Sequence, residues 1–135
     1  MKGIITMLIA CCFTICSYSQ EASLPELEAF VAGKNKGDIS KKILLSQTGI
    51  LPRVTHTTTN IPFKYLITKF TIQVIRNNKV MLTRKVAGDK FDDTIETIFN
   101  NTLSGDIISI TDIYCSISPM DKTVMLYPIK LTIRD

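Results

Sequence analysis

Two long alternating segments within residues 63–86, which meet at Asn77-Asn78, constrain the fold of this chain more than any other feature. In the first segment apolar and polar residues alternate. Phe70, Ile72 and Val74 fall on one face, and Lys69, Thr71 and Gln73 fall on the other. Because successive side chains of a strand point to opposite faces, this pattern predicts a sheet with one apolar and one polar face. Asparagine tolerates the positive φ of a two-residue hairpin loop, so we expect a hairpin. A lone hairpin is marginal in water, and another element must cover its apolar face.

A predicted helix over residues 93–103 would provide that cover. Its apolar side chains recur at helical spacing and form one stripe, made of Ile95, Ile98, Phe99 and Leu103. Asp93 and Glu96 predict a capping box at the helix start, where acidic groups suit the positive end of the helix dipole.

Shorter patterns predict the remaining elements. A first strand is expected in residues 26–32, and Ser40 is a suitable N-cap for a short helix over residues 41–47. Other strands are expected over residues 50–54, 106–118 with a bend near Thr111-Asp112, and 123–133, where Pro52 and Pro128 favour edges or bulges. Together these patterns predict an α+β fold, mainly β, with an antiparallel β-sandwich-like sheet, one main helix and one short helix.

The chain has 135 residues, of which 45% are hydrophobic and 21% charged, and its formal net charge is +4. This length suffices for one domain with an apolar core, and the composition is that of a globular protein rather than a disordered one. The basic residues are scattered along the sequence, without the clustered face or motif that nucleic-acid binding requires. We therefore expect no nucleic-acid partner.

Residues 1–19 predict an export signal. Lys2 supplies a positive start, an uncharged and mostly apolar run follows, and small residues lead to Ser19. We expect cleavage between Ser19 and Gln20, then a flexible lead-in over residues 20–25 and a single domain over residues 26–135. The apolar run is shorter than the ~20 residues that a spanning helix needs, so no transmembrane span is expected after processing.

A lipoprotein signal is the alternative. The segment Leu8-Ile9-Ala10-Cys11 resembles a lipobox, in which Cys11 would be lipidated. The apolar run before Cys11 would then be very short for a signal. We therefore expect a periplasmic or secreted protein, with an outer-membrane lipoprotein as the alternative.

The cysteine and histidine content argues against catalysis. Cys11, Cys12 and Cys16 lie in the predicted signal, so processing leaves Cys115 without an intramolecular disulfide partner. Cys115 lies in a strand-like run and is expected to be a small buried hydrophobe. His56, the only histidine, lies among threonines without a partner for a metal site. Because phosphate-loop, hydrolase and metalloprotease motifs are also missing, we expect no enzyme activity, cofactor or metal.

Two groups of charged residues could suggest functional sites, but simpler structural explanations account for them. Asp92, Asp93 and Glu96 suit the start of the predicted helix. The segments Arg84-Lys85 and Lys34-Asn35-Lys36 would mark a basic contact surface, although such pairs are more often simply solvated.

Two series of short motifs carry a family resemblance. The first half contains Phe30-Val31-Ala32-Gly33-Lys34, Gly37-Asp38-Ile39-Ser40 before a short helix, Gly49 and Phe70-Thr71-Ile72. The second half contains Ala87-Gly88-Asp89-Lys90-Phe91 before a helix, Gly105 after it, Asp112-Ile113, the turn Pro119-Met120-Asp121-Lys122, and Leu126-Tyr127-Pro128-Ile129. In order and spacing, this series resembles the C-terminal domain of GldM, the gliding-motility and type IX secretion protein of Bacteroidetes. The resemblance covers about residues 30–133.

The resemblance implies a periplasmic, β-rich domain of sandwich type with a packed helix and no chemistry of its own. In GldM this domain is the distal end of a dimeric shaft that links an inner-membrane motor to outer-membrane-associated partners. Here a cleavable signal and one domain stand in place of the transmembrane helix and earlier domains of GldM, so coupling to a proton motive force is not expected. Lys36-Gly37 also replaces a frequent glycine pair, and no glycine follows Asp121.

We expect an exported interaction or assembly module, an accessory of gliding or type IX secretion machinery. Its candidate partners are envelope proteins and a second copy of itself, as a homodimer. Contact by an added strand is expected at an edge formed by Thr55, His56, Thr57, Thr58 and Thr59. The alternative is a lipid-anchored envelope protein that binds a small ligand in an apolar pocket between sheet and helix.

Overall fold

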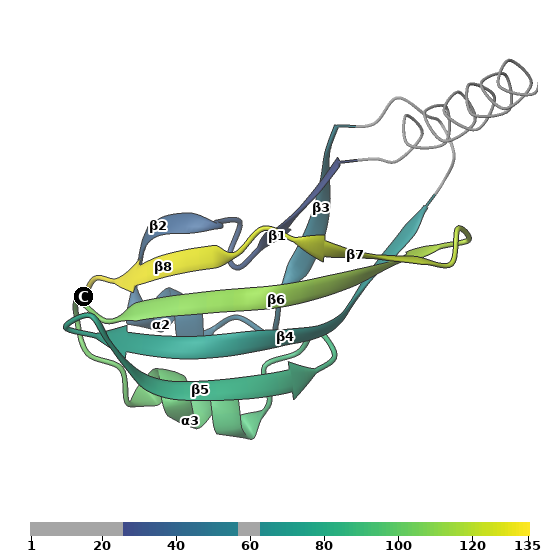
Figure 1. Ribbon diagram of the computed structural model, residues 1–135. Coiled ribbons are helices and arrows are strands. Elements are labelled where there is room, and N and C mark those ends of the chain that lie inside the picture. The colour runs from purple at the N-terminus through teal and green to yellow at the C-terminus, as the bar shows by residue number, and fades with distance from the viewer. Residues whose placement is uncertain (1–25, 57–62) are drawn as a thin grey trace, which may run out of the picture. The chain divides into compact units, whose positions relative to one another are not determined.

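The computed structural model describes residues 26–56 and 63–135 (Figure 1). Several predicted features lie outside the described residues, namely the signal, the lead-in, Cys11, Ser19, Gln20, Thr57, Thr58 and Thr59. Within the described part, residues 27–53 and 63–135 form one compact unit, whereas Glu26 and residues 54–56 belong to a second.

A six-stranded sheet forms the frame of the larger unit. Its order is β2 (Lys36–Ile39), β8 (Ile129–Ile133), β6 (Ile107–Ser118), β4 (Lys64–Arg76) and β5 (Lys79–Ala87), with β7 (Lys122–Leu126) also paired to β6. Neighbouring strands are antiparallel except β2 and β8, which are parallel (Figure 1). A separate two-stranded sheet joins β1 (Glu26–Phe30) to β3 (Leu51–His56). The predicted α+β, mainly β fold is confirmed.

The predicted hairpin is β4 and β5. Asn77 and Asn78 have φ angles of 51° and 63°, as a two-residue hairpin turn requires. Phe70, Ile72 and Val74 are buried on what we call the inner face of the sheet. The opposite, outer face carries the alternating residues Lys69, Thr71 and Gln73 of β4 and their partners on β5 and β6.

The apolar pattern of the two central strands changes parity partway along each strand. In β4 the buried apolar side chains pass from Ile67 to Phe70, and in β6 they pass from Ile110 to Ile113. Each step is three residues instead of two. In a regular strand, the apolar side chains after the step would therefore point to the opposite face from those before it. A bulge in each strand restores the alternation and keeps the buried side chains on the inner face.

The bulges lie around the pair formed by Lys69 and Tyr114. The β4–β6 register shifts on both sides of Lys69, between Ile67 and Lys69 and between Lys69 and Thr71. Asp112, in the β6 bulge, has a φ of 49°, which confirms the bend predicted near Thr111-Asp112. Aspartate is one of the few residues that enter this left-handed region at low cost.

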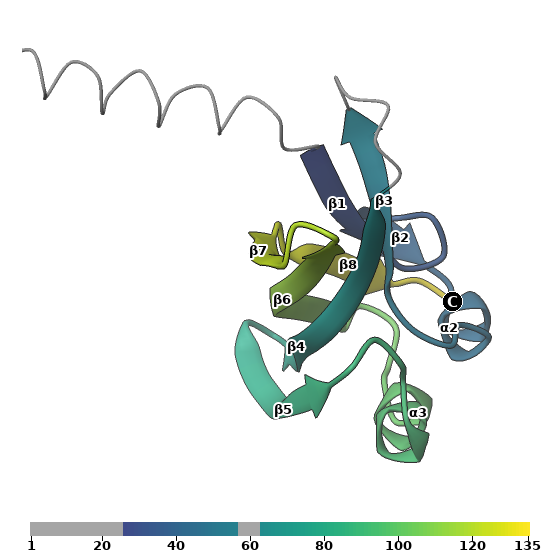
Figure 2. The same ribbon diagram turned by 90° about the vertical axis from the view of Figure 1, so that its right-hand side faces the viewer.

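Two helices, α2 (Lys41–Leu45) and α3 (Asp93–Asn100), lie on the same side of the sheet (Figure 2). Phe91, which precedes α3, packs edge-on against Phe70 of β4 at 6.1 Å between ring centroids and against Phe99 of α3 at 5.1 Å. This aromatic chain fixes α3 on the inner face, and Ile95 is fully buried beneath it. The expected cover for the apolar face is therefore present.

The helix α3 differs from its prediction at both ends. Asp92, not Asp93, is the N-cap, because its extended backbone lets its carboxylate accept the Ile95 N–H at 2.9 Å. The helix ends at Asn100 instead of residue 103, because the Leu103 N–H turns away to the Asp106 carboxylate at 2.8 Å. Leu103 is consequently 56% exposed and does not belong to the buried stripe.

The other boundaries also differ in part from the expected ones. The short helix begins after its predicted cap Ser40 but ends at Leu45, where Ser46 and Gln47 side chains donate to the Ile43 carbonyl. The strand expected over residues 123–133 is divided into β7 and β8 at Tyr127-Pro128, because proline lacks a ladder donor. The first strand ends at Phe30, before a turn at Ala32 and Gly33 with positive φ.

Gly49 joins the two segments that carry the helices. It forms an isolated bridge with Lys90, flanked by hydrogen bonds from the Ile50 N–H to the Asp89 carbonyl and from the Phe91 N–H to the Thr48 carbonyl. A Cβ at residue 49 would clash with the Asp89 carbonyl oxygen, so only glycine allows this approach.

An ion pair between Arg76 and Asp106 lies at the end of the hairpin that carries the Asn77-Asn78 turn. The guanidinium donates two hydrogen bonds to the carboxylate, at 2.9 and 2.8 Å, and Asp106 is only 2% exposed. The hydrogen bond from Arg76, assisted by the Leu103 N–H, holds the pKa of Asp106 below its usual value. The pair therefore ties β4 to the turn that follows α3.

We predict that Asp106→Asn lowers the free energy of unfolding by about 1–3 kcal/mol at pH 7, because Arg76 loses its buried charged acceptor. Since the folded pKa of Asp106 is depressed, its contribution is present above the unfolded pKa of about 3.9 and is lost as pH falls towards the folded value. Urea denaturation at several pH values should therefore show a smaller loss of stability in acid for Asp106→Asn. Asp38→Asn is the control, because its 3.5 Å pair with Arg134 is exposed; an equal effect there would contradict the prediction.

We also predict that Asp112→Val destabilises the fold by about 1–2 kcal/mol, because a β-branched residue is strained at positive φ. Asp112→Asn should be nearly neutral, since asparagine tolerates this conformation. Ser109→Val, at a regular strand position of β6, controls for the added β-branch. Chemical denaturation of the three variants would measure the difference, and equal stabilities for Asp112→Val and Asp112→Asn would count against the bulge as a constraint.

Candidate interaction surface

The predicted interaction edge is described only at its start. Thr55 and His56 are the last residues of β3, and the exposed Thr55 hydroxyl donates to the Glu26 carbonyl at 3.4 Å within the smaller unit. Thr57, Thr58 and Thr59 lie outside the described residues. The edge therefore stays a prediction.

The structure separates Arg84 from Lys85, which the sequence placed together as a basic pair. Arg84 lies opposite Ile72 on the inner face and forms an ion pair with Asp92 at 3.1 Å. The pKa of Asp92 is lowered, first by the Ile95 N–H and then by Arg84. Lys85 lies opposite Thr71 on the outer face. Arg84 thus anchors the start of α3, and only Lys85 remains available to an outer partner.

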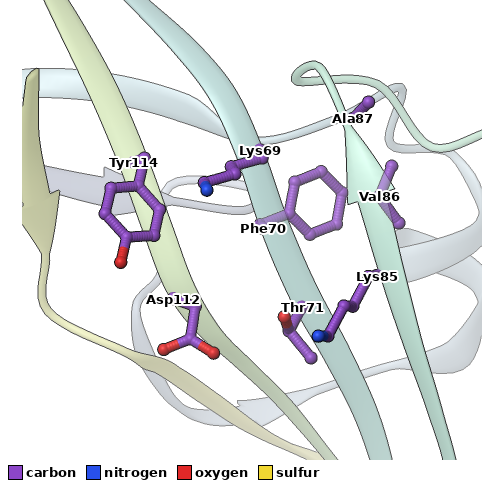
Figure 3. Close-up of a pocket in the computed structure, with 8 residues that line it drawn as sticks. All are labelled: Lys69, Phe70, Thr71, Lys85, Val86, Ala87, Asp112 and Tyr114. Atoms are coloured by element: carbon purple, nitrogen blue, oxygen red, sulfur yellow. The ribbon is translucent and has the colours of Figure 1, made fainter.

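A hollow of about 510 Å³ opens on the outer face around Lys85 (Figure 3). Three neighbouring strands line it, with Lys69, Phe70 and Thr71 from β4, Lys85, Val86 and Ala87 from β5, and Asp112 and Tyr114 from β6. Because Phe70 and Val86 are buried, the polar side chains form the rim. We call this site the outer hollow.

The polar groups of the outer hollow face its opening from different sides. Figure 3 shows Lys69 and Tyr114 next to each other, with Asp112 below Tyr114 and Lys85 beside Thr71. The Lys69 ammonium lies 4.5 Å from the centroid of the Tyr114 ring, a cation–π contact that restrains the lysine. The same bulge that gives Asp112 its positive φ brings this carboxylate to the rim.

A second, smaller hollow of about 240 Å³ lies between the sheet and α3. It is lined by Val74, Arg76, Met81, Leu82, Ile98, Asn101 and Thr102. Its volume is below the ~300–1,000 Å³ typical of small-molecule sites. The alternative function, small-ligand binding between sheet and helix, would need its pocket at this location, where the hollow is smaller than typical ligand sites.

Cys115 is fully buried, and burial raises the pKa of its thiol, which makes the nucleophilic thiolate scarce. Among the residues that the structure describes, no group of three or more histidine, cysteine or acidic side chains could hold a metal ion. Cys115 faces the inner side, away from Asp112 in the outer hollow.

The outer hollow was not predicted from the sequence. Its residues on β5 and β6 lie 25 or more positions apart in the sequence, and their meeting depends on a β4–β6 register that contains two bulges. The sequence does contain one indication of this site. The three-residue apolar spacing around Asp112 indicates the bulge that brings Asp112 to the rim.

A family model assigns the chain to a known family. No curated protein matches the chain. In the described part of the chain, no helix has the length and apolar character needed to cross a membrane. The family model of the GldM C-terminal domain matches residues 18–134, nearly the full length of the sequence. The chain therefore belongs to the GldM C-terminal domain family, a family related to gliding motility and type IX secretion.

Proposed function

We propose that this protein is a non-catalytic interaction module of the cell envelope, periplasmic or secreted after removal of residues 1–19. In this proposal it binds envelope proteins, and a second copy of itself, as an accessory of gliding or type IX secretion machinery. Membership in the GldM C-terminal domain family supports the link to that machinery.

The observation that carries the proposal is the outer face of the sheet, which no helix of the described residues covers. Both described helices lie on the other side, at the inner face (Figure 2). On the outer face, Leu66 is 57% and Met125 62% exposed, close to polar and charged side chains. Exposed apolar side chains within a polar surround are typical of surfaces that bind proteins.

The edge at residues 55–59 is a second contact surface in this proposal. A strand at the edge of a sheet presents unpaired backbone groups to which an extended segment of a partner can add. Thr55 is exposed at the end of β3, where that addition would begin.

We predict that cross-linking in the native envelope, followed by affinity capture and mass spectrometry, recovers gliding or type IX secretion components with the protein. The mature N-terminus mapped in the same experiment should be Gln20. An untagged strain controls for non-specific capture. Recovery of only unrelated proteins would contradict the role in that machinery, and a mature protein that begins with an acylated Cys11 would contradict the proposed processing.

We further predict that Thr55→Lys combined with Thr58→Lys reduces the recovery of those partners several-fold, because charges at a strand edge oppose strand addition. Thr94→Lys combined with Thr97→Lys, at two exposed threonines of α3, is the matched control. Quantitative mass spectrometry of the captured proteins measures the change. Equal recovery from all variants would rule out the edge as a contact surface.

A further inference from the structure

We propose that the outer hollow is a docking site for an acidic polypeptide segment, with a partner's aspartate or glutamate carboxylate between Lys69 and Lys85. This inference rests on the proposed function and specifies the chemistry of its partner. It also assigns a site that is separate from the edge at residues 55–59.

The two lysines are placed to act together. On β4 and β5, Lys69 lies opposite Ala87 and Lys85 opposite Thr71, so both ammonium groups rise from adjacent strands on the same face. Among the described residues, the ion pairs involve Arg76, Arg84 and Arg134, and neither lysine has an acidic partner. Both charges are thus available to a carboxylate from another molecule.

The hollow is also shaped for a side chain. Its volume of about 510 Å³ falls in the range of binding pockets, and a carboxylate side chain occupies only part of it. Tyr114 restrains the Lys69 ammonium by the cation–π contact at 4.5 Å, which reduces the entropy lost on binding. The Thr71 hydroxyl, beside Lys85, supplies a neutral donor to the same region (Figure 3).

The charge of the whole face favours an acidic partner. Pairing registers place several lysines on the outer face, namely Lys36, Lys64, Lys69, Lys85 and Lys130. Asp38 lies on the same face, but it is paired with Arg134 at 3.5 Å. A face with this excess of positive charge steers an acidic surface towards it and raises the association rate.

Asp112 favours a polypeptide over a simple anion. Its carboxylate lies at the rim near the lysines, where it offers hydrogen-bond acceptors that a free carboxylate ligand cannot use. A peptide segment brings backbone N–H donors together with its acidic side chain, and Asp112 accepts such donors. The exposed Leu66 and Met125 on the same face add apolar contacts that a free anion cannot use.

The direct test is a titration of the protein purified from its native envelope with a fluorescein-labelled hexaglutamate peptide, followed by fluorescence anisotropy. We expect saturable binding that weakens with added salt, because screening shortens the reach of these charges. The double variant Lys69→Ala, Lys85→Ala should bind about tenfold more weakly, as expected for the loss of two charge-assisted contacts.

The control is Lys42→Ala, Lys90→Ala, which removes the same charge from exposed positions on α2 and before α3. It should bind the peptide within about twofold of the unaltered protein, since charges off the binding surface contribute little. Equal weakening in both double variants would overturn the site, because binding would then follow net charge alone. Binding of inorganic phosphate, or of vesicles with anionic lipid, that depends on Lys69 and Lys85 while the peptide does not bind would also overturn it.

The native cross-linking separates this inference from the proposed function. Loss of partners in the Lys69→Ala, Lys85→Ala variant, with partners retained in the control, would support the docking site. Retention of all partners in both variants would refute the docking site and leave the interaction function standing. If the unaltered protein captures no envelope partner, the proposed function fails, whereas the peptide titration still decides the chemistry of the hollow.

Discussion

The pairing of β4 with β6 is the constraint on which the rest of this structure depends. Both strands carry a three-residue step in their apolar pattern, from Ile67 to Phe70 and from Ile110 to Ile113. Because the register shifts around Lys69 and Tyr114, these steps fall at nearly the same level of the sheet. A mismatch between them would expose half of one strand's apolar side chains to water, so the two irregularities stabilise one register and exclude its neighbours.

This register decides which face is covered and which is free. The inner face takes the aromatic chain that runs through Phe91, and the Gly49 bridge holds the two helix-bearing segments together beside it. With both described helices on that side, no described helix covers the lysines and the bulge of the outer face (Figure 2). The proposed binding surface is therefore a consequence of how the core is covered.

The sequence predicted the features that depend on local chemistry. Side-chain alternation predicted the hairpin, the asparagine pair predicted its turn, and the apolar stripe predicted α3 with its buried Ile95 and Phe99. The pattern could not reveal that Asp106 draws the Leu103 N–H away and ends α3 early, because that carboxylate is placed by Arg76 from another strand. It also missed the parallel strand β2, which is short, lacks alternation and is held by its pairing with β8. The outer hollow escaped prediction for the same reason, since long-range register assembles it.

Cys115 gives this sheet an internal reporter of its motions. The residue lies between Ile67 of β4 and Val124 of β7 and is fully buried, with a thiol whose pKa is raised by burial. A thiol-directed reagent can reach this sulfur only in molecules whose strands have separated locally. The rate of its modification under native conditions therefore measures the free energy of opening at the centre of the sheet, without any label that would disturb the packing.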